Sequence, residues 1–204
     1  MKILPKVLGT VLSAVLGLAA AAWPAPAHAT DLIVVAQSAL RFVCMFDADC
    51  SNSIGPSGIG TLPTSERGSD PRLQSLAFEA KPGTPGAGNT VYVYRVDLTK
   101  ADRLTECLAG LVVNFGPPAR MPSDIAKVAH VFVITPGGLG TVGVKSADQD
   151  GDFIQFNFDG PVCAGQSSLF FGLASKNPPV SSEAILFGYG TPPISQASAR
   201  TPRH

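Results

Sequence analysis

The chain has few of the residues on which catalysis and nucleic-acid binding usually depend. Its 204 residues include three histidines, one tryptophan, and 15 acidic against 15 basic side chains. A net charge of zero without any basic cluster argues against a nucleic-acid partner. The sequence also contains no GxSxG or HExxH motif and no phosphate-binding glycine loop that opens a helix. The motifs of the common hydrolases, metalloproteases and nucleotide-binding proteins are therefore missing.

The N-terminal segment has the three parts of a secretory signal peptide. Lys2 and Lys6 accompany an apolar run over residues 7–22, and the sequence AHA at 27–29 offers the small residues of a cleavage site. An uncleaved anchor is disfavoured because the run is short and no basic residues follow it. Cleavage after Ala29 leaves 175 residues with 13 basic and 15 acidic side chains and no membrane span. The sequence thus predicts a protein that is secreted or periplasmic.

Four cysteines, Cys44, Cys50, Cys107 and Cys163, remain after this cleavage. An even number of cysteines in an exported protein indicates disulfides. Of the three possible pairings we favour Cys44–Cys50, which closes a short loop, together with Cys107–Cys163, which joins two distant strand ends. A thiolate metal site is disfavoured because there is no CxxC motif and no histidine near any of the four.

Short alternating apolar segments, separated by Gly, Pro, Asn and Asp, dominate the remaining sequence. Their Val, Ile, Phe and Tyr residues favour strands. In FIQFNF (153–158) the alternation gives one apolar and one polar face, whereas TVYVYRVDL (90–98) is apolar on both faces at its start. About nine strands are expected, at 39–46, 73–80, 90–98, 108–115, 127–135, 141–145, 153–158, 168–175 and 184–190. We therefore predict an all-β fold, a two-layer antiparallel β-sandwich of jelly-roll or immunoglobulin-like topology, with a β-barrel as the alternative.

The expected domain organisation is simple. Residues 30–190 form a single domain, in which the polar Gly/Pro/Ser-rich stretch 51–72 is a long surface loop. Residues 191–204 are expected to be a flexible tail. The best helix candidate is DIAKVA (124–129), with Ser123 as its N-cap, and it competes with the strand expected at 127–135.

The stretch SADQDGDFIQFNFDG is the most acidic part of the chain, with Asp148, Asp150, Asp152 and Asp159. An EF-hand loop that started at Asp148 would need Gly at its sixth position and Glu at its twelfth, where this chain has Phe153 and Asp159. A looser calcium site formed by the four aspartates is one hypothesis, and no other cofactor is expected. The favoured interpretation is an exposed hairpin turn, because Asp and Gly suit the backbone of such turns.

Two further groups of ionisable residues are candidate sites. A Cys44–Cys50 disulfide would hold Asp47 and Asp49 close together, as a cation site or the carboxylate pair of a glycosidase requires. His130 lies on an apolar strand face, where a histidine is more often a hydrogen-bonded core residue than a catalytic base. No catalytic residue is assigned.

The segment NFDGPVCAGQSSLFFGLASKNPP (157–179) resembles the closing portion of secreted bacterial β-sandwich proteins of the PEP-CTERM-associated kind. The resemblance covers about a tenth of the chain and concerns a strand, a Gly/Pro break and a second strand. The sorting tail of those proteins is missing here, because no apolar span or basic cluster follows Tyr189. The resemblance implies a surface or extracellular sandwich and carries over no catalytic residue.

Taken together, these patterns favour a non-enzymatic binding or structural module that meets a ligand at the cell surface or outside the cell. One alternative is a carboxylate-dependent, glycoside-type hydrolase that uses Asp47, Asp49 or the 148–152 cluster. The other is a calcium-stabilised, adhesin-like module. The hydrolase requires two of these carboxylates to converge in a concave pocket, whereas the binding module does not.

Overall fold

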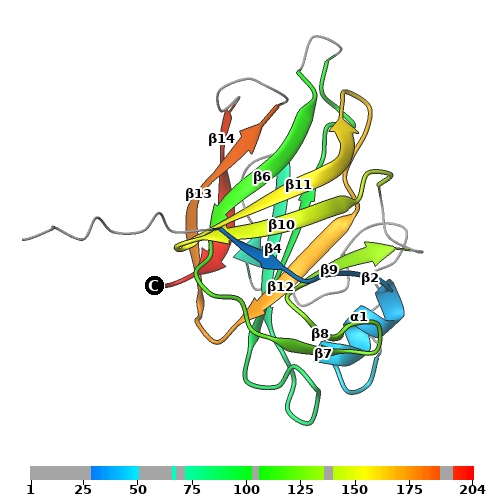
Figure 1. Cartoon of the computed structure of the whole chain (residues 1–204), viewed down its shortest axis with the longest axis vertical. Coiled ribbons are helices and arrows are strands. Elements are labelled where there is room, and N and C mark those ends of the chain that lie inside the picture. Colours follow the sequence, from blue (N-terminus) through cyan, green and yellow to red (C-terminus); the bar gives the residue numbers. More distant parts are fainter. Residues whose placement is uncertain (1–28, 51–65, 68–71, 103–105, 136–139, 189–194) are drawn as a thin grey trace, which may run out of the picture.

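The computed structural model describes residues 29–50, 66–67, 72–102, 106–135, 140–188 and 195–204, which form two packed sheets (Figure 1). The first sheet has the order β1-β10-β11-β6-β13-β14, and all of its neighbouring strands are antiparallel. Its strands are β1 (Thr30–Leu32), β10 (Val144–Asp150), β11 (Phe153–Val162), β6 (Leu108–Asn114), β13 (Pro179–Phe187) and β14 (Ser195–Pro202).

The second sheet has the order β2-β9-β12-β5-β4-β3, with β2 and β9 parallel and the other neighbours antiparallel. Its strands are β2 (Val34–Ser38), β9 (Val131–Thr135), β12 (Phe170–Ser175), β5 (Thr90–Val96), β4 (Leu73–Glu79) and β3 (Glu66–Arg67). A hairpin of β7 (Met121–Ser123) and β8 (Lys127–Ala129) and one helix, α1 (Ala39–Phe46), complete the described elements. The predicted all-β sandwich is confirmed. Both six-stranded sheets are open, so the alternative, a closed β-barrel, is wrong.

The main hydrophobic core lies between the two sheets. The strand β11 contributes Ile154, Phe156 and Phe158, which are buried as the alternation predicted. Tyr92 and Tyr94 of β5 meet them from the second sheet, and Tyr94 lies 6.3 Å from Phe156, centroid to centroid. This is the packing that a two-layer sandwich needs, with the inner faces of both sheets apolar.

A second, smaller core lies on the outer face of the second sheet. The strand β5 is apolar on both faces, as predicted, so Val91 and Val93 point away from the main core. They are covered by Phe42 and Phe46 of α1, and Phe42 also stands edge-on to Phe132 of β9 at 6.1 Å. The helix therefore closes a sheet face that would otherwise expose a large apolar surface.

The prediction of a strand at 39–46 is wrong, because these residues form α1. Phe42, Val43 and Phe46 are buried, a spacing of one and four residues that places them on one face of a helix. Ser38 caps the helix, and its hydroxyl accepts a hydrogen bond of 3.4 Å from the Arg41 N–H. Apolar residues fill all of ALRFVCMF except one position, so the periodicity of this short segment fits a strand as well as a helix.

Two other structural predictions fail. The helix expected at 124–129 is the turn and second strand of the β7–β8 hairpin, with Lys127 at a φ of 61°. The Ser123 hydroxyl does accept a hydrogen bond from the Ile125 N–H, as the hydroxyl of a helix N-cap would, but the residues after Ser123 form a turn and no helix. The flexible tail expected at 191–204 contains β14, which pairs along its whole length with β13 and buries Ala197 and Ala199. All but the last residue of the predicted signal peptide (1–29) and most of the predicted loop at 51–72 lie outside the described residues.

Both favoured disulfides are confirmed. Cys107 precedes β6 and Cys163 follows β11, and these two strands pair at their adjoining ends, where Leu108 lies opposite Val162. The bond therefore closes one end of the first sheet. Cys44 lies in α1 and bonds to Cys50, four residues beyond the end of the helix, with 4.5 Å between the two Cα atoms. This second bond fixes the chain that leaves the helix.

Candidate functional site

An apolar groove of about 370 Å³ runs beside α1. The helix forms one wall, the β7–β8 hairpin forms another, and the turn that follows β4 adds Pro85. Figure 1 shows α1 and the hairpin together at one end of the molecule. Leu40 of α1 and Ile125 at the hairpin tip are 63% and 62% exposed, although both are large apolar side chains. The groove is lined by Gln37, Leu40, Arg41, Cys44, Met45, Pro85, Pro122, Ser123, Asp124 and Ile125.

The wall formed by α1 is fixed at its C-terminal end by the segment that follows β4. The last carbonyl groups of a helix have no partner within the helix. Here the carbonyl of Met45 accepts from the Gly86 N–H at 2.9 Å, and that of Phe46 accepts from the Lys81 N–H at 2.8 Å. Gly86 is required at this point, because a Cβ atom there would collide with the Phe46 ring. These bonds hold Pro85 against the groove.

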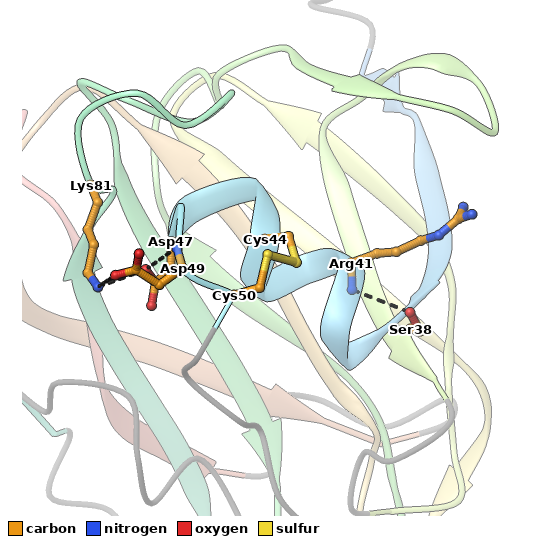
Figure 2. Close-up of a disulfide and its surroundings, with 7 residues drawn as sticks. All are labelled: Ser38, Arg41, Cys44, Asp47, Asp49, Cys50 and Lys81. Carbon is orange, nitrogen blue, oxygen red and sulfur yellow. Dashed lines mark hydrogen bonds and ion pairs between the residues drawn. A yellow bond between two sulfur atoms is a disulfide. The ribbon is translucent and has the colours of Figure 1, made fainter.

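Side chains strengthen the same junction, as Figure 2 shows. The ammonium of Lys81 lies 2.7 Å from Asp47 Oδ1 and 3.6 Å from Asp49 Oδ2. The Asp47 side chain is only 5% exposed, whereas that of Asp49 is 76% exposed. The hydrogen bond from Lys81 to Asp47 raises the pKa of this lysine above its ordinary value of 10.5, so the lysine is charged at neutral pH.

This arrangement bears on the hydrolase alternative. A glycosidase needs one carboxyl group that gives up a proton and another that stays ionised, both facing the substrate. Asp47 instead forms an ion pair with Lys81 and accepts a bond of 3.2 Å from the Asp49 N–H. Both carboxylates lie at the junction of α1 and the turn after β4, and neither lines the groove. The pair therefore has a structural role at this junction.

The four aspartates of the acidic stretch are not brought together. Asp148 and Asp150 lie on β10, with the turn at Gly151 and Asp152, so the predicted hairpin is correct. Asp159 lies beside the opposite end of β10, where its Oδ1 accepts from the Gly143 N–H at 2.8 Å. That position is roughly 20 Å from the turn at the rise of an extended strand. Among the described residues, no three carboxylates, imidazoles or thiols cluster as metal ligands would.

Asp148 has a different environment from the other three. It lies directly opposite Asp31 in the pairing of β1 with β10, and its Oδ2 accepts a bond of 3.0 Å from Asn157 Nδ2. Burial raises the pKa of Asp148 above its ordinary value of 3.8. A hydrogen bond with Asp31 and the charge of Asp31 raise this pKa further, while the bond from Asn157 acts in the opposite direction. Two opposed carboxylates on neighbouring strands destabilise the sheet edge when both are charged.

His130 forms a structural hydrogen bond, as the favoured interpretation had it, but it is half-buried and does not belong to the core. It separates β8 from β9, and its Nδ1 accepts a bond of 3.0 Å from the Ile33 N–H. Ile33 is the residue at which the chain passes from β1 in the first sheet to β2 in the second. Burial lowers the pKa of His130 below its ordinary value of 6.5, and the charge of Arg120 lowers it further. The neutral imidazole therefore fixes the crossing between the two layers.

Gln37 is the groove residue with the most unusual environment. It lies on β2, two residues after the buried Val35 and on the same face, and it is only 8% exposed. Its backbone carbonyl accepts a bond from the Thr135 hydroxyl at 3.2 Å. Its side-chain Nε2 is buried and has no hydrogen-bond partner. A buried donor in this condition is uncommon in folded proteins.

Sequence reasoning did not find this groove. The sequence predicts a strand at Leu40 and a helix at Ile125, so it places neither of them on an exposed surface. The only available signal was the presence of two large apolar residues beside polar neighbours, Arg41 and Asp124. Such isolated residues are common on protein surfaces and indicate nothing by themselves.

Fold and groove define an all-β sandwich with a helix that carries a small apolar site. Compared with models of known protein families, with curated proteins and with solved structures, the chain has no significant match. Among the described residues, no helix has the length and apolar character needed to cross a membrane. The functional argument therefore rests on the groove itself.

Proposed function

We propose that this chain is an exported bacterial β-sandwich protein that acts as a non-enzymatic binding module, with the groove beside α1 as its binding surface. The exposure of Leu40 and Ile125 on the two walls of the groove is the observation that carries the proposal. A ligand that removes such exposed apolar side chains from water binds favourably.

Two other features support the proposal. The walls of the groove are held by the Cys44–Cys50 disulfide, by the carbonyl bonds of Met45 and Phe46, and by the Lys81 ion pair. A rigid site loses little conformational entropy on binding. The two disulfides suit an oxidising compartment, which is where an exported protein would act. Hydrolysis is disfavoured because neither Asp47 nor Asp49 lines the groove.

A fragment screen tests this function. Two-dimensional amide NMR spectra of the folded protein, residues 30–204, would be recorded with a library of small apolar compounds. We expect several compounds to shift the resonances of α1 and the β7–β8 hairpin in the wild type and to lose this effect in Leu40→Ser/Ile125→Ser. The control is Phe153→Ser, since Phe153 is 53% exposed at the distant β10–β11 turn.

Ester, peptide and glycoside model substrates would be assayed on the same samples, and we expect no turnover. Shifts that persist in the groove variant, or shifts that are absent altogether, would contradict the proposed binding surface. Turnover that Asp47→Asn abolishes would replace the binding module with the hydrolase.

A further inference from the structure

We infer that the tip of the β7–β8 hairpin, residues 122–128, is a flap that opens and closes over the groove, and that the Arg41–Asp124 ion pair is its latch. This inference rests on the proposed function and adds a means of controlling ligand entry and release. It starts from a difference between the walls of the groove. The α1 wall and Pro85 are held by the contacts described above, whereas the hairpin belongs to neither of the six-stranded sheets.

The hairpin is anchored at its base. Met121 and Ala129 lie opposite each other there, and both are buried in the second core. Just before β7, the Ala119 N–H donates to the Ala174 carbonyl of β12 at 2.7 Å. Beyond this base the hairpin extends away from the core, because none of the described residues 122–128 belongs to either hydrophobic cluster. The tip can therefore open without disturbing the packing of the sandwich.

The backbone of the tip favours such opening. The Val128 N–H donates to the Ala126 carbonyl at 2.7 Å, which bends the chain tightly around Lys127 at a φ of 61°. A residue with a side chain adopts this conformation at a cost, and a γ-turn of this hand is strained. Two strands without a third neighbour also gain little stability from their own hydrogen bonds. Most residues of the tip are exposed to solvent as well.

A polar contact joins the tip to α1. Arg41 Nη1 of the helix lies 3.7 Å from Asp124 Oδ2 in the turn of the hairpin. The two side chains are 64% and 88% exposed, so water and salt screen the attraction between them. An exposed pair of this kind favours the closed tip by about two- to fivefold. The closed and open forms can therefore interconvert readily.

The tip also supplies part of the apolar lining of the groove. Pro122 and Ile125 line the groove from the hairpin, and Leu40 lines it from α1. Figure 1 shows these two elements next to each other. Opening of the tip removes one wall and lets a ligand enter or leave, whereas the ion pair keeps that wall in place. Because salt weakens the ion pair, even an uncharged ligand should leave faster at high ionic strength.

Amide hydrogen exchange of the ligand-free protein tests the flap. The protection factor of the Val128 amide, whose hydrogen bond lies within the tip, would be compared with those of β11, which lies inside a six-stranded sheet. We expect Val128 to be at least about tenfold less protected. Asp124→Asn should lower its protection a further two- to fivefold, by about the contribution of the ion pair. Asp152→Asn, which removes an exposed carboxylate from the β10–β11 turn, is the matched control and should change neither.

Ionic strength and the strained residue give two further tests. Raising the salt concentration from about 20 mM to about 500 mM should lower the protection of Val128 in the wild type and leave it nearly constant in Asp124→Asn, which has no charged pair to screen. Glycine adopts a positive φ without the cost that Lys127 incurs. Lys127→Gly should therefore protect Val128 about fivefold more than Lys127→Ala, which removes the same charge.

The control of ligand release is tested with N-phenyl-1-naphthylamine, an uncharged apolar dye whose fluorescence rises in apolar sites. Its release from the protein would be followed by stopped-flow dilution at the same two salt concentrations. We expect salt to speed release from the wild type about two- to fivefold and to leave release from Asp124→Asn unchanged.

The possible outcomes separate the flap from the proposed function. Equal protection of Val128 and β11, or protection that does not respond to Asp124→Asn, would overturn the flap while the groove remains a binding surface. Dye release that is independent of both salt and Asp124 would overturn the control of ligand exchange. Failure of the dye to bind would contradict the proposed function, and with it the role of the flap, even if the tip opens as expected.

Discussion

The ion pair between Asp47 and Lys81 offers the sharpest test of how the groove is held. We expect Asp47→Ala to destabilise the protein and Asp49→Ala to leave it nearly unchanged. The two aspartates are two residues apart and both approach the same ammonium, at 2.7 Å and 3.6 Å. They differ in burial, since the Asp47 side chain is 5% exposed and that of Asp49 is 76% exposed.

The magnitude follows from the contacts that each substitution removes. Asp47→Ala removes the short bond from Lys81 and the acceptor for the Asp49 N–H. Hydrogen bonds to a charged group contribute about 1.5–3 kcal/mol, so we expect a loss of about 2 kcal/mol. For a protein of this length that is about 4–8 °C in Tm. Asp49→Ala removes a long, exposed contact worth at most about 0.5 kcal/mol.

Urea unfolding, followed by far-UV circular dichroism at neutral and alkaline pH, measures this difference. The bond from Asp47 raises the pKa of Lys81 above 10.5, so its contribution is complete below that value and is lost as the pH rises through the raised pKa. The gap between the wild type and Asp47→Ala should therefore narrow in strongly alkaline solution. Equal destabilisation by the two substitutions, or a gap independent of pH, would refute the reasoning.

Two ionisable groups and one disulfide give further tests. Because the pKa of His130 is lowered, the stabilisation by its neutral form is lost as the pH falls from about 6.5 through the lowered pKa. The urea midpoint of His130→Gln should therefore depend less on pH than that of the wild type between about pH 7 and pH 5. The raised pKa of Asp148 means that its charge opposes folding above that pKa. Asp31→Asn should therefore stabilise the protein at neutral pH by less than about 1 kcal/mol, and this gain should vanish below pH 3.8, where both states bind the proton. Cys107→Ser/Cys163→Ser should cost about 2–5 kcal/mol in the same unfolding assay, and a loss below about 1 kcal/mol would contradict the role given to that bond.

The layered fold could be predicted because its strands alternate clearly. In FIQFNF the apolar and polar faces are unambiguous, and residues 153–158 lie in β11 with the faces as expected. The cysteine pairing was also accessible, since Cys107 and Cys163 each lie next to a strong strand pattern. These patterns depend only on residues close together in the sequence, so they can be interpreted without knowledge of the elements that pack against them.

The helix and the last strand could not be predicted, for opposite reasons. The segment 39–46 is so rich in apolar residues that its pattern fits the period of a helix and the period of a strand equally well. The helix forms because α1 covers the apolar outer face of β5. The strand β14 has the reverse problem, because SQASARTP contains only small and polar residues. It is recruited by its partner β13, and Ser181 pairs with Ser198 at 2.9 Å between hydroxyl oxygens. Tertiary context decides both segments.

The groove could not be predicted from the sequence for a related reason. Its lining comes from β2, α1, the turn after β4 and the β7–β8 hairpin, which are widely separated in the sequence. No pattern of residue types contains that information.

The first sheet takes its outermost strands from the two ends of the described chain, β1 at one edge and β14 at the other. A polypeptide that emerges from its N-terminus can assemble the inner strands of this layer before β14 arrives. Until then the backbone of β13 (Pro179–Phe187) presents an open ladder of hydrogen-bonding groups to any extended chain nearby. The last strand, β14, pairs with this edge of β13 and so covers it. Molecules shortened by proteolysis just before Ser195 would be prone to associate through the exposed edge of β13.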